Sequence, residues 1–88
     1  MSNPERRIDP ERQAEIDEEN RKLRRMQWVV NMVMATICDT NVSVEEASEL
    51  IASTRNYILG LFPGKELAYD LIYRPRFQRL MSERFHLQ

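Results

Sequence analysis

Cysteine and histidine are the residue types best suited to metal binding or nucleophilic catalysis, and this chain has one of each, Cys38 and His86. The two lie far apart in the sequence, and neither has a second cysteine or histidine nearby. Cys38 ends an apolar run, a position where thiols are commonly buried and unreactive. His86 is close to the C-terminus. We therefore expect neither a metal site nor a catalytic pair from these residues.

Acidic side chains are the next candidates for chemistry, but their spacing does not predict a site. The segment from Asp39 to Glu45 has oxygen ligands at alternate positions, as a calcium-binding loop does. However, Val44 stands where the sharp turn of such a loop requires glycine, and Leu50 stands where the bidentate glutamate belongs. The consecutive acids at 17–19 do not face one another on a helix. We therefore expect no enzymatic activity, no metal and no cofactor.

Basic residues form two clusters that could contact phosphate groups. The first consists of Arg21, Lys22, Arg24 and Arg25, and the second of Arg74, Arg76, Arg79 and Arg84. A nucleic-acid-binding chain usually has a large excess of base, whereas this chain has 13 basic and 14 acidic residues. Glu66 and Asp70 would also repel phosphate. A nucleic-acid-binding regulator that uses segments 21–25 and 74–84 is therefore the alternative function.

Charge is arranged in blocks along the chain. Residues 1–20 carry a net charge of −4 and residues 21–38 carry +4. Residues 39–70 then carry −4 and residues 71–88 carry +3. Blocks of opposite sign can pair within one chain or between two chains. We favour such pairing over phosphate binding, and we expect the blocks to orient helices against each other.

The elements that must position these residues are all predicted to be helices. Asp9 can cap a helix that begins at Pro10 and runs to about residue 38, and Asp39-Thr40-Asn41 can stop it. Ser43 and Glu46 predict a capping box for a second, antiparallel helix over about 44–62.

Pro63-Gly64 ends that second helix, and a third is predicted over about 65–87 with a kink at Pro75. We expect this helix to bury Leu67, Ala68, Leu71 and Ile72, and to carry an exposed pair between Asp70 and Arg74. Residues 1–8 are predicted to be a flexible segment, and residues 9–88 a single all-α domain, a three-helix bundle.

The predicted helix over 10–38 has two apolar stripes. Leu23, Met26, Val30, Val33 and Ile37 follow the spacing of a helix packed lengthwise against another helix. Trp28, Met32 and Ala35 form a second stripe at the positions i, i+4 and i+7. A helix that is apolar on two sides is expected to be buried on two sides.

Two arrangements would cover the second stripe. In a closed three-helix bundle, the third helix covers it. In a homodimer, a second copy covers it across a two-fold axis, with Arg21 and Arg25 also at the interface. Helix lengths favour the dimer, because a helix over 10–38 spans about 43 Å while one over 44–62 spans about 28 Å. The N-terminal part of the first helix would otherwise have no neighbour.

The leading prediction is therefore a small cytoplasmic interaction module that pairs with itself or with another helical protein. One cysteine suits a reducing compartment, and the polar, acidic N-terminus does not have the pattern of a signal peptide. The longest apolar run, residues 26–38, is too short to span a bilayer. No motif indicates a small-molecule substrate.

Overall fold

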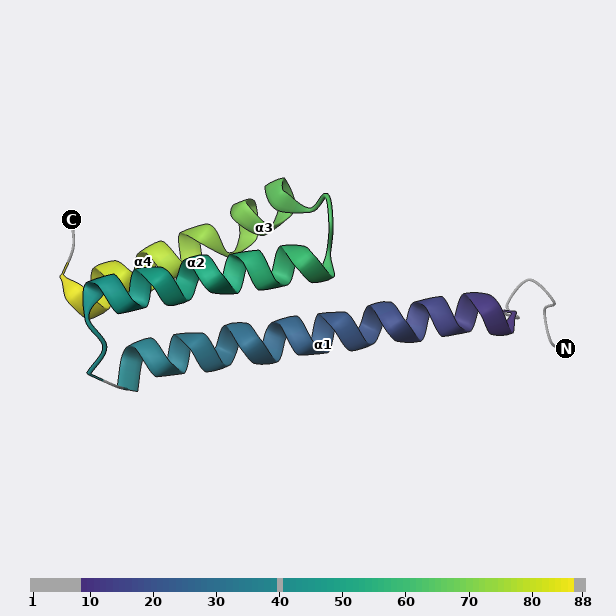
Figure 1. The fold of residues 1–88 in the computed structure, drawn as a ribbon, viewed down its shortest axis with the longest axis horizontal. Helices are drawn as coiled ribbons and strands as arrows, with labels where there is room; N and C mark the ends of the chain where they lie inside the picture. The colour runs from purple at the N-terminus through teal and green to yellow at the C-terminus, as the bar shows by residue number, and fades with distance from the viewer. Residues whose placement is uncertain (1–8, 40, 87–88) are drawn as a thin grey trace, which may run out of the picture.

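The computed structural model describes residues 9–39 and 41–86, and within them it contains four α-helices and no β-strand. These are α1 (Pro10–Asp39), α2 (Val44–Leu61), α3 (Glu66–Ile72) and α4 (Arg74–Phe85). α2 runs antiparallel to α1, and α3 and α4 return beside α2 with a change of direction between them, so the chain forms three packed helical rods (Figure 1). This confirms the predicted all-α architecture. The predicted flexible segment over 1–8 lies outside the described residues.

Local capping signals fix where α1 and α2 begin. The backbone N–H of Arg12 donates to the Asp9 carboxylate at 2.8 Å, which caps α1 as predicted. At the start of α2, the backbone N–H of Glu46 donates to the Ser43 hydroxyl at 3.1 Å, and the backbone N–H of Ser43 donates to the Glu46 carboxylate at 3.3 Å. The capping box is therefore confirmed. Each of these helices ends within one residue of its predicted last position.

The predicted third helix is divided two residues earlier than expected. The sequence predicts a kink at Pro75, whereas the structure ends α3 at Ile72 and begins α4 at Arg74, with Tyr73 between them. Pro75 has no N–H to donate to the carbonyl of Leu71, and its ring crowds that carbonyl, so the helix changes direction before the proline. Pro75 then occupies the first turn of α4, where proline is well tolerated. α4 ends at Phe85, and residue 87 lies outside the described part of the chain.

The core lies between α1 and the two rods that cover it. The buried residues are Val30, Val33 and Ile37 of α1, Ala47 and Ile58 of α2, Tyr69 of α3 and Phe77 of α4. The first apolar stripe of α1 is thus confirmed at its C-terminal end. Leu23, at the other end of the stripe, is 40% exposed because α2 ends beside it.

α3 is rotated relative to the prediction. Leu67, Leu71 and Ile72 were expected to be buried, yet they are 73%, 69% and 56% exposed, and Ala68 is exposed as well. The inward residue is instead Tyr69, whose ring centroid lies 5.3 Å from that of Tyr73. A helix of seven residues has too little apolar face to determine its own orientation, so contacts with α2 determine it.

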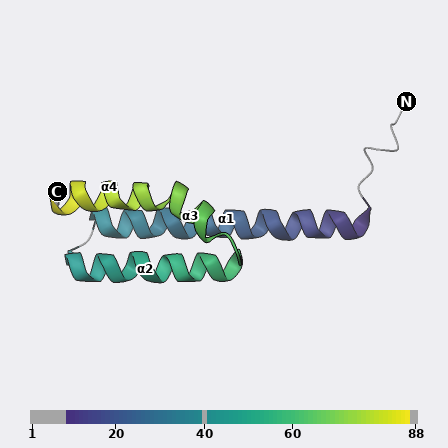
Figure 2. The same ribbon diagram turned by 90° about the horizontal axis from the view of Figure 1, so that it is seen from above.

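α1 extends well beyond the rest of the molecule. Its 30 residues span about 45 Å, whereas the 18 residues of α2 span about 27 Å. Seen from above, α2, α3 and α4 cover only the C-terminal half of α1 (Figure 2). We call the uncovered segment, residues 10–21, the arm. Every residue in the arm is exposed.

Candidate functional site

The outer face of α1 is the surface that the fold leaves uncovered. Trp28 is 62% exposed and Met32 is 48% exposed, and Ala35 is also exposed one turn further along. Val30 and Val33, on the opposite side of the same turns, are buried in the core. The second stripe is therefore not covered by the third rod, and the closed three-helix arrangement does not describe this chain.

Charged residues flank the outer face. Arg21, the last residue of the arm, and Arg25 lie on the same side of α1 as Trp28, and both are exposed. Arg21 donates to Glu18 within its own helix at 2.7 Å, an exposed ion pair that contributes little stability. Asp39 ends the stripe at the other side and is also exposed. The outer face thus has an apolar centre, a basic end and an acidic end.

The two arginine clusters do not form one compact patch. Arg84 donates to the carbonyl of Ile37 at 3.1 Å, at the far end of α1 from the first cluster. About 18 Å of helix separates Ile37 from Arg25. Arg76 lies over the ring of Tyr73, with its guanidinium carbon 5.7 Å from the centroid. The second cluster is therefore spread along α4 rather than gathered beside the first.

A shallow apolar hollow of about 250 Å³ lies where the arm leaves the bundle. Apolar side chains from α1, the end of α2 and α3 line it, among them Leu23, Met26, Leu59 and Ile72. The exposed Leu67 and Leu71 belong to the same short helix as Ile72. This surface was not predicted, because its α3 members were expected to face the core.

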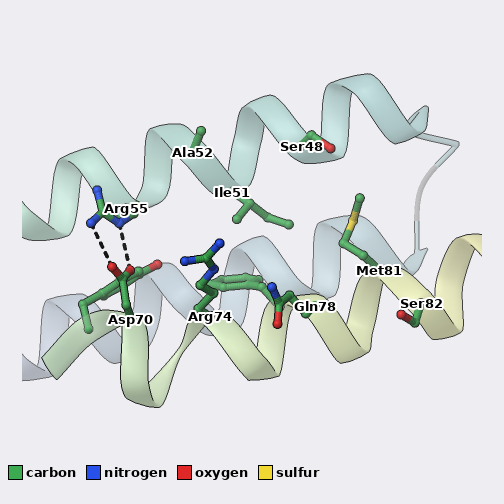
Figure 3. A pocket seen from close by; sticks show the side chains of 11 residues that line it. Ser48, Ile51, Ala52, Arg55, Asp70, Arg74, Gln78, Met81 and Ser82 are labelled. Carbon is green, nitrogen blue, oxygen red and sulfur yellow. Dashed lines mark hydrogen bonds and ion pairs between the residues drawn. The ribbon is translucent and has the colours of Figure 1, made fainter. Parts of the chain in front are cut away.

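A larger cavity of about 690 Å³, open to solvent like the hollow, lies between α2 and the α3–α4 rod (Figure 3). No residue of α1 lines it. Ile51, Ala52, Phe77 and Met81 supply apolar surface. Polar side chains also line it: Ser48, Arg55, Tyr69, Asp70, Arg74, Gln78 and Ser82.

An ion pair closes one end of this cavity. The Arg55 guanidinium donates to both carboxylate oxygens of Asp70, from Nε at 2.9 Å and from Nη2 at 3.0 Å. The predicted pair between Asp70 and Arg74 is thus replaced by one that links α3 to α2. Its hydrogen bond lowers the pKa of Asp70 below the ordinary value and raises the pKa of Arg55. Both groups are therefore charged at neutral pH.

The Tyr69 hydroxyl is buried without a hydrogen-bond partner, and it is the only side-chain oxygen or nitrogen of that kind among the described residues. The residue is only 6% exposed. Burial raises the pKa of the hydroxyl; Asp70 adds to the rise and Arg55 opposes it. Tyr69 therefore keeps its proton at neutral pH. An unpaired buried hydroxyl is uncommon and calls for an explanation.

Arg74 lies beside Tyr69 and Asp70 in the cavity lining. Its side chain extends from α4 toward α2, into the space between Asp70 and Gln78 (Figure 3). Within the part of the chain that the structure describes, its guanidinium has neither a hydrogen bond nor an ion pair. The charge of Arg74 also helps to lower the pKa of Asp70. The cavity therefore combines apolar lining residues with one guanidinium that makes no hydrogen bond.

Sequence reasoning missed this cavity because it treated Asp70 and Arg74 as a solvated pair. One signal was present: Asp70, Arg74 and Gln78 recur at every fourth position, which places a polar row along one edge of a helix. Nothing in the sequence indicated that Arg55, 15 positions away from Asp70, would complete the row. That contact depends on how α3 packs against α2.

Cys38 and His86 lie near the end of the bundle opposite the arm. Cys38 is exposed in the last turn of α1, so the expectation of a buried thiol is wrong. His86 follows α4 in a left-handed conformation with φ of 57°. In residues 9–39 and 41–86, no three His, Cys, Asp or Glu side chains form a group that could hold a metal ion.

Comparison with protein-family models, with curated proteins and with solved structures finds no match. A search of the described helices also finds none that is both long and apolar enough to cross a membrane.

Proposed function

We propose that this chain is a helical protein–protein interaction module that pairs with a second copy of itself through the outer face of α1, without catalysis of its own. The supporting observation is the exposure of Trp28, which is 62% accessible directly across α1 from the core. Large aromatic side chains are the commonest anchors of protein interfaces. Pairing would remove Trp28, Met32 and Ala35 from water, and this burial supplies the driving force.

Charge favours an antiparallel pair. Trp28 and Met32 lie at equal distances before and after Val30 along α1. In an antiparallel pair whose two-fold axis passes at the level of Val30, Trp28 of one copy therefore lies opposite the partner's Met32. Arg21 and Asp39 are also equally far from Val30, so the same register brings Arg21 opposite the partner's Asp39. A parallel pair would instead place Arg21 against the partner's Arg21, and this like-charge contact is unfavourable.

Multi-angle light scattering over a range of concentrations tests the pairing. We expect the wild-type chain to approach twice the monomer mass as concentration rises. Trp28→Glu should keep the monomer mass while retaining wild-type helicity by circular dichroism, because Trp28 is not part of the core. Tyr57→Glu is the matched control: Tyr57 is 44% exposed on α2, outside the proposed interface, and its substitution should leave the mass unchanged.

Charge reversal tests the orientation. Arg21→Glu and Asp39→Arg should each weaken association, and the double variant should restore it, because the pair is rebuilt with opposite signs. A wild-type chain that remains monomeric at every concentration contradicts self-association. A pair that forms but is not rescued by the double variant contradicts the antiparallel register alone.

A further inference from the structure

The cavity between α2 and the α3–α4 rod has the form of a small-molecule site. Its volume of about 690 Å³ lies in the range of roughly 300–1,000 Å³ that is common for ligand pockets. Ile51, Phe77 and Met81 supply apolar lining from α2 and α4. From Arg74 to Met81, α4 advances about 10 Å, so this lining can hold an extended apolar chain of that length.

The polar end of the cavity carries two guanidinium groups against one carboxylate, and that carboxylate interacts with both. Arg55 and Asp70 form a bidentate pair and compensate each other. Arg74 remains, and its side chain extends into the same space (Figure 3). The lining thus has two arginines and one acid, which matches a ligand with a single negative charge.

Tyr69 lines both this cavity and the hollow beside the arm, and its hydroxyl lies near enough to Arg55 and Asp70 for their charges to shift its pKa. Its hydroxyl is buried and has no partner among the described residues, although the residue lines the cavity. Because the hydroxyl is closed off from solvent in the free chain, the Tyr69 side chain must turn before a ligand oxygen can reach it. That contact would supply the missing partner and remove the cost of leaving the hydroxyl unpaired. A carboxylate has two oxygens, so it can accept from the Arg74 guanidinium and from the Tyr69 hydroxyl together.

We propose that this cavity binds a monocarboxylate with an apolar tail, with the carboxylate between Arg74 and Tyr69 and the tail along Ile51, Phe77 and Met81. The same chemistry is offered by a free medium-chain fatty acid and by the C-terminal carboxylate of a peptide that ends in an apolar residue. Arg55 and Asp70 close the polar end and hold α3 against α2. α1 supplies no lining residue, so the site is independent of the proposed pairing.

Isothermal titration calorimetry with defined probes tests the site. Octanoate, kept below its micelle concentration, represents the free acid, and octanol has the same tail without the charge. An acetylated tripeptide ending in leucine is used with a free carboxylate and as the amide. We expect the carboxylate member of at least one pair to bind at least about tenfold more tightly than its uncharged counterpart. The pair that behaves in this way identifies the source of the ligand.

Variants locate the binding. Arg74→Gln should weaken the carboxylate at least about tenfold, since it removes a charge-assisted hydrogen bond. Tyr69→Phe should weaken it several-fold and leave the uncharged probe unaffected. Arg79→Gln is the matched control, because Arg79 is exposed on α4 but does not line the cavity. The Trp28→Glu chain should bind as the wild type does.

Three results would overturn the proposal. Neither carboxylate binds at millimolar concentration; each carboxylate binds no better than its uncharged counterpart; or Arg74→Gln and Arg79→Gln reduce affinity equally. Circular dichroism of each variant shows whether it is folded, so that a loss of calorimetric binding can be assigned to the site and not to unfolding. Because both arginines are exposed on the same helix, their replacement leaves the core intact.

Discussion

At the scale of single residues, Arg55 and Asp70 join two helices through a contact between charged side chains. Both side chains retain partial exposure, 38% and 29%, so solvent weakens the attraction. The bidentate geometry nevertheless gives the contact a defined direction, which an ordinary surface pair lacks. It therefore helps to fix the rotation of α3, and with it the position of Tyr69.

Asp70→Asn should lower stability at neutral pH and have a smaller effect in acid. The folded state holds the pKa of Asp70 below its ordinary value of 3.8, so the unfolded chain takes up this proton more readily. The stabilising contribution of the carboxylate is therefore complete above about pH 5 and disappears as the pH falls through the folded pKa. Urea denaturation of both chains between pH 7 and pH 2.5 measures the difference, or gap, between their free energies of unfolding. A gap that widens in acid would contradict this account.

Tyr69→Phe should leave stability unchanged or raise it by about 1 kcal/mol, because it removes a buried hydroxyl that has no partner. Tyr69→Ala should instead cost about 3–5 kcal/mol, since the ring is part of the core. Thermal and urea unfolding of the two variants separate the ring from the hydroxyl. A loss above about 1 kcal/mol in the phenylalanine variant would mean that the hydroxyl is hydrogen-bonded in the free protein.

At the scale of helices, the connection between α1 and α2 is specified locally. The reciprocal bonds of Ser43 and Glu46 satisfy backbone N–H groups at the start of α2. Ser43→Ala should cost about 1 kcal/mol in urea denaturation, while Ser53→Ala, an exposed position within α2, should change stability by less than about 0.5 kcal/mol. Equal effects at the two positions would argue that the capping box does not stabilise α2.

The starts and ends of α1 and α2 were predictable because their signals lie within a few residues of one another: Asp9 with Arg12, Ser43 with Glu46, and Pro63-Gly64 after α2. The side of α3 that faces the core was not predictable in this way. Its sequence offered Leu67, Leu71 and Ile72 as an apolar face, but the Tyr69 ring packs into the core and Asp70 pairs with Arg55 of α2. The same limit applies to the candidate sites. The outer face of α1 followed from helical spacing, whereas the cavity required Arg55 and Asp70 to meet.

At the scale of the whole molecule, we expect the folded bundle to be stable without most of the arm. Residues 10–18 are exposed and contribute no member of the core. A chain that begins at Glu19 should therefore unfold within about 1 kcal/mol of the full-length chain. Ile37→Ala, which opens a cavity at a fully buried position, should cost about 2–5 kcal/mol. Urea unfolding measures both, and a large loss on truncation would mean that the arm contacts something in solution.

The projecting half of α1 also determines how the protein travels through a gel matrix. The radius of gyration is 17.5 Å and the principal extents are 59 × 24 × 18 Å, whereas a compact chain of this length has a radius of gyration of about 12 Å. A rod-like particle has a larger Stokes radius than a sphere of equal mass. A single chain will therefore elute ahead of globular standards of its own mass and can be mistaken for an assembly.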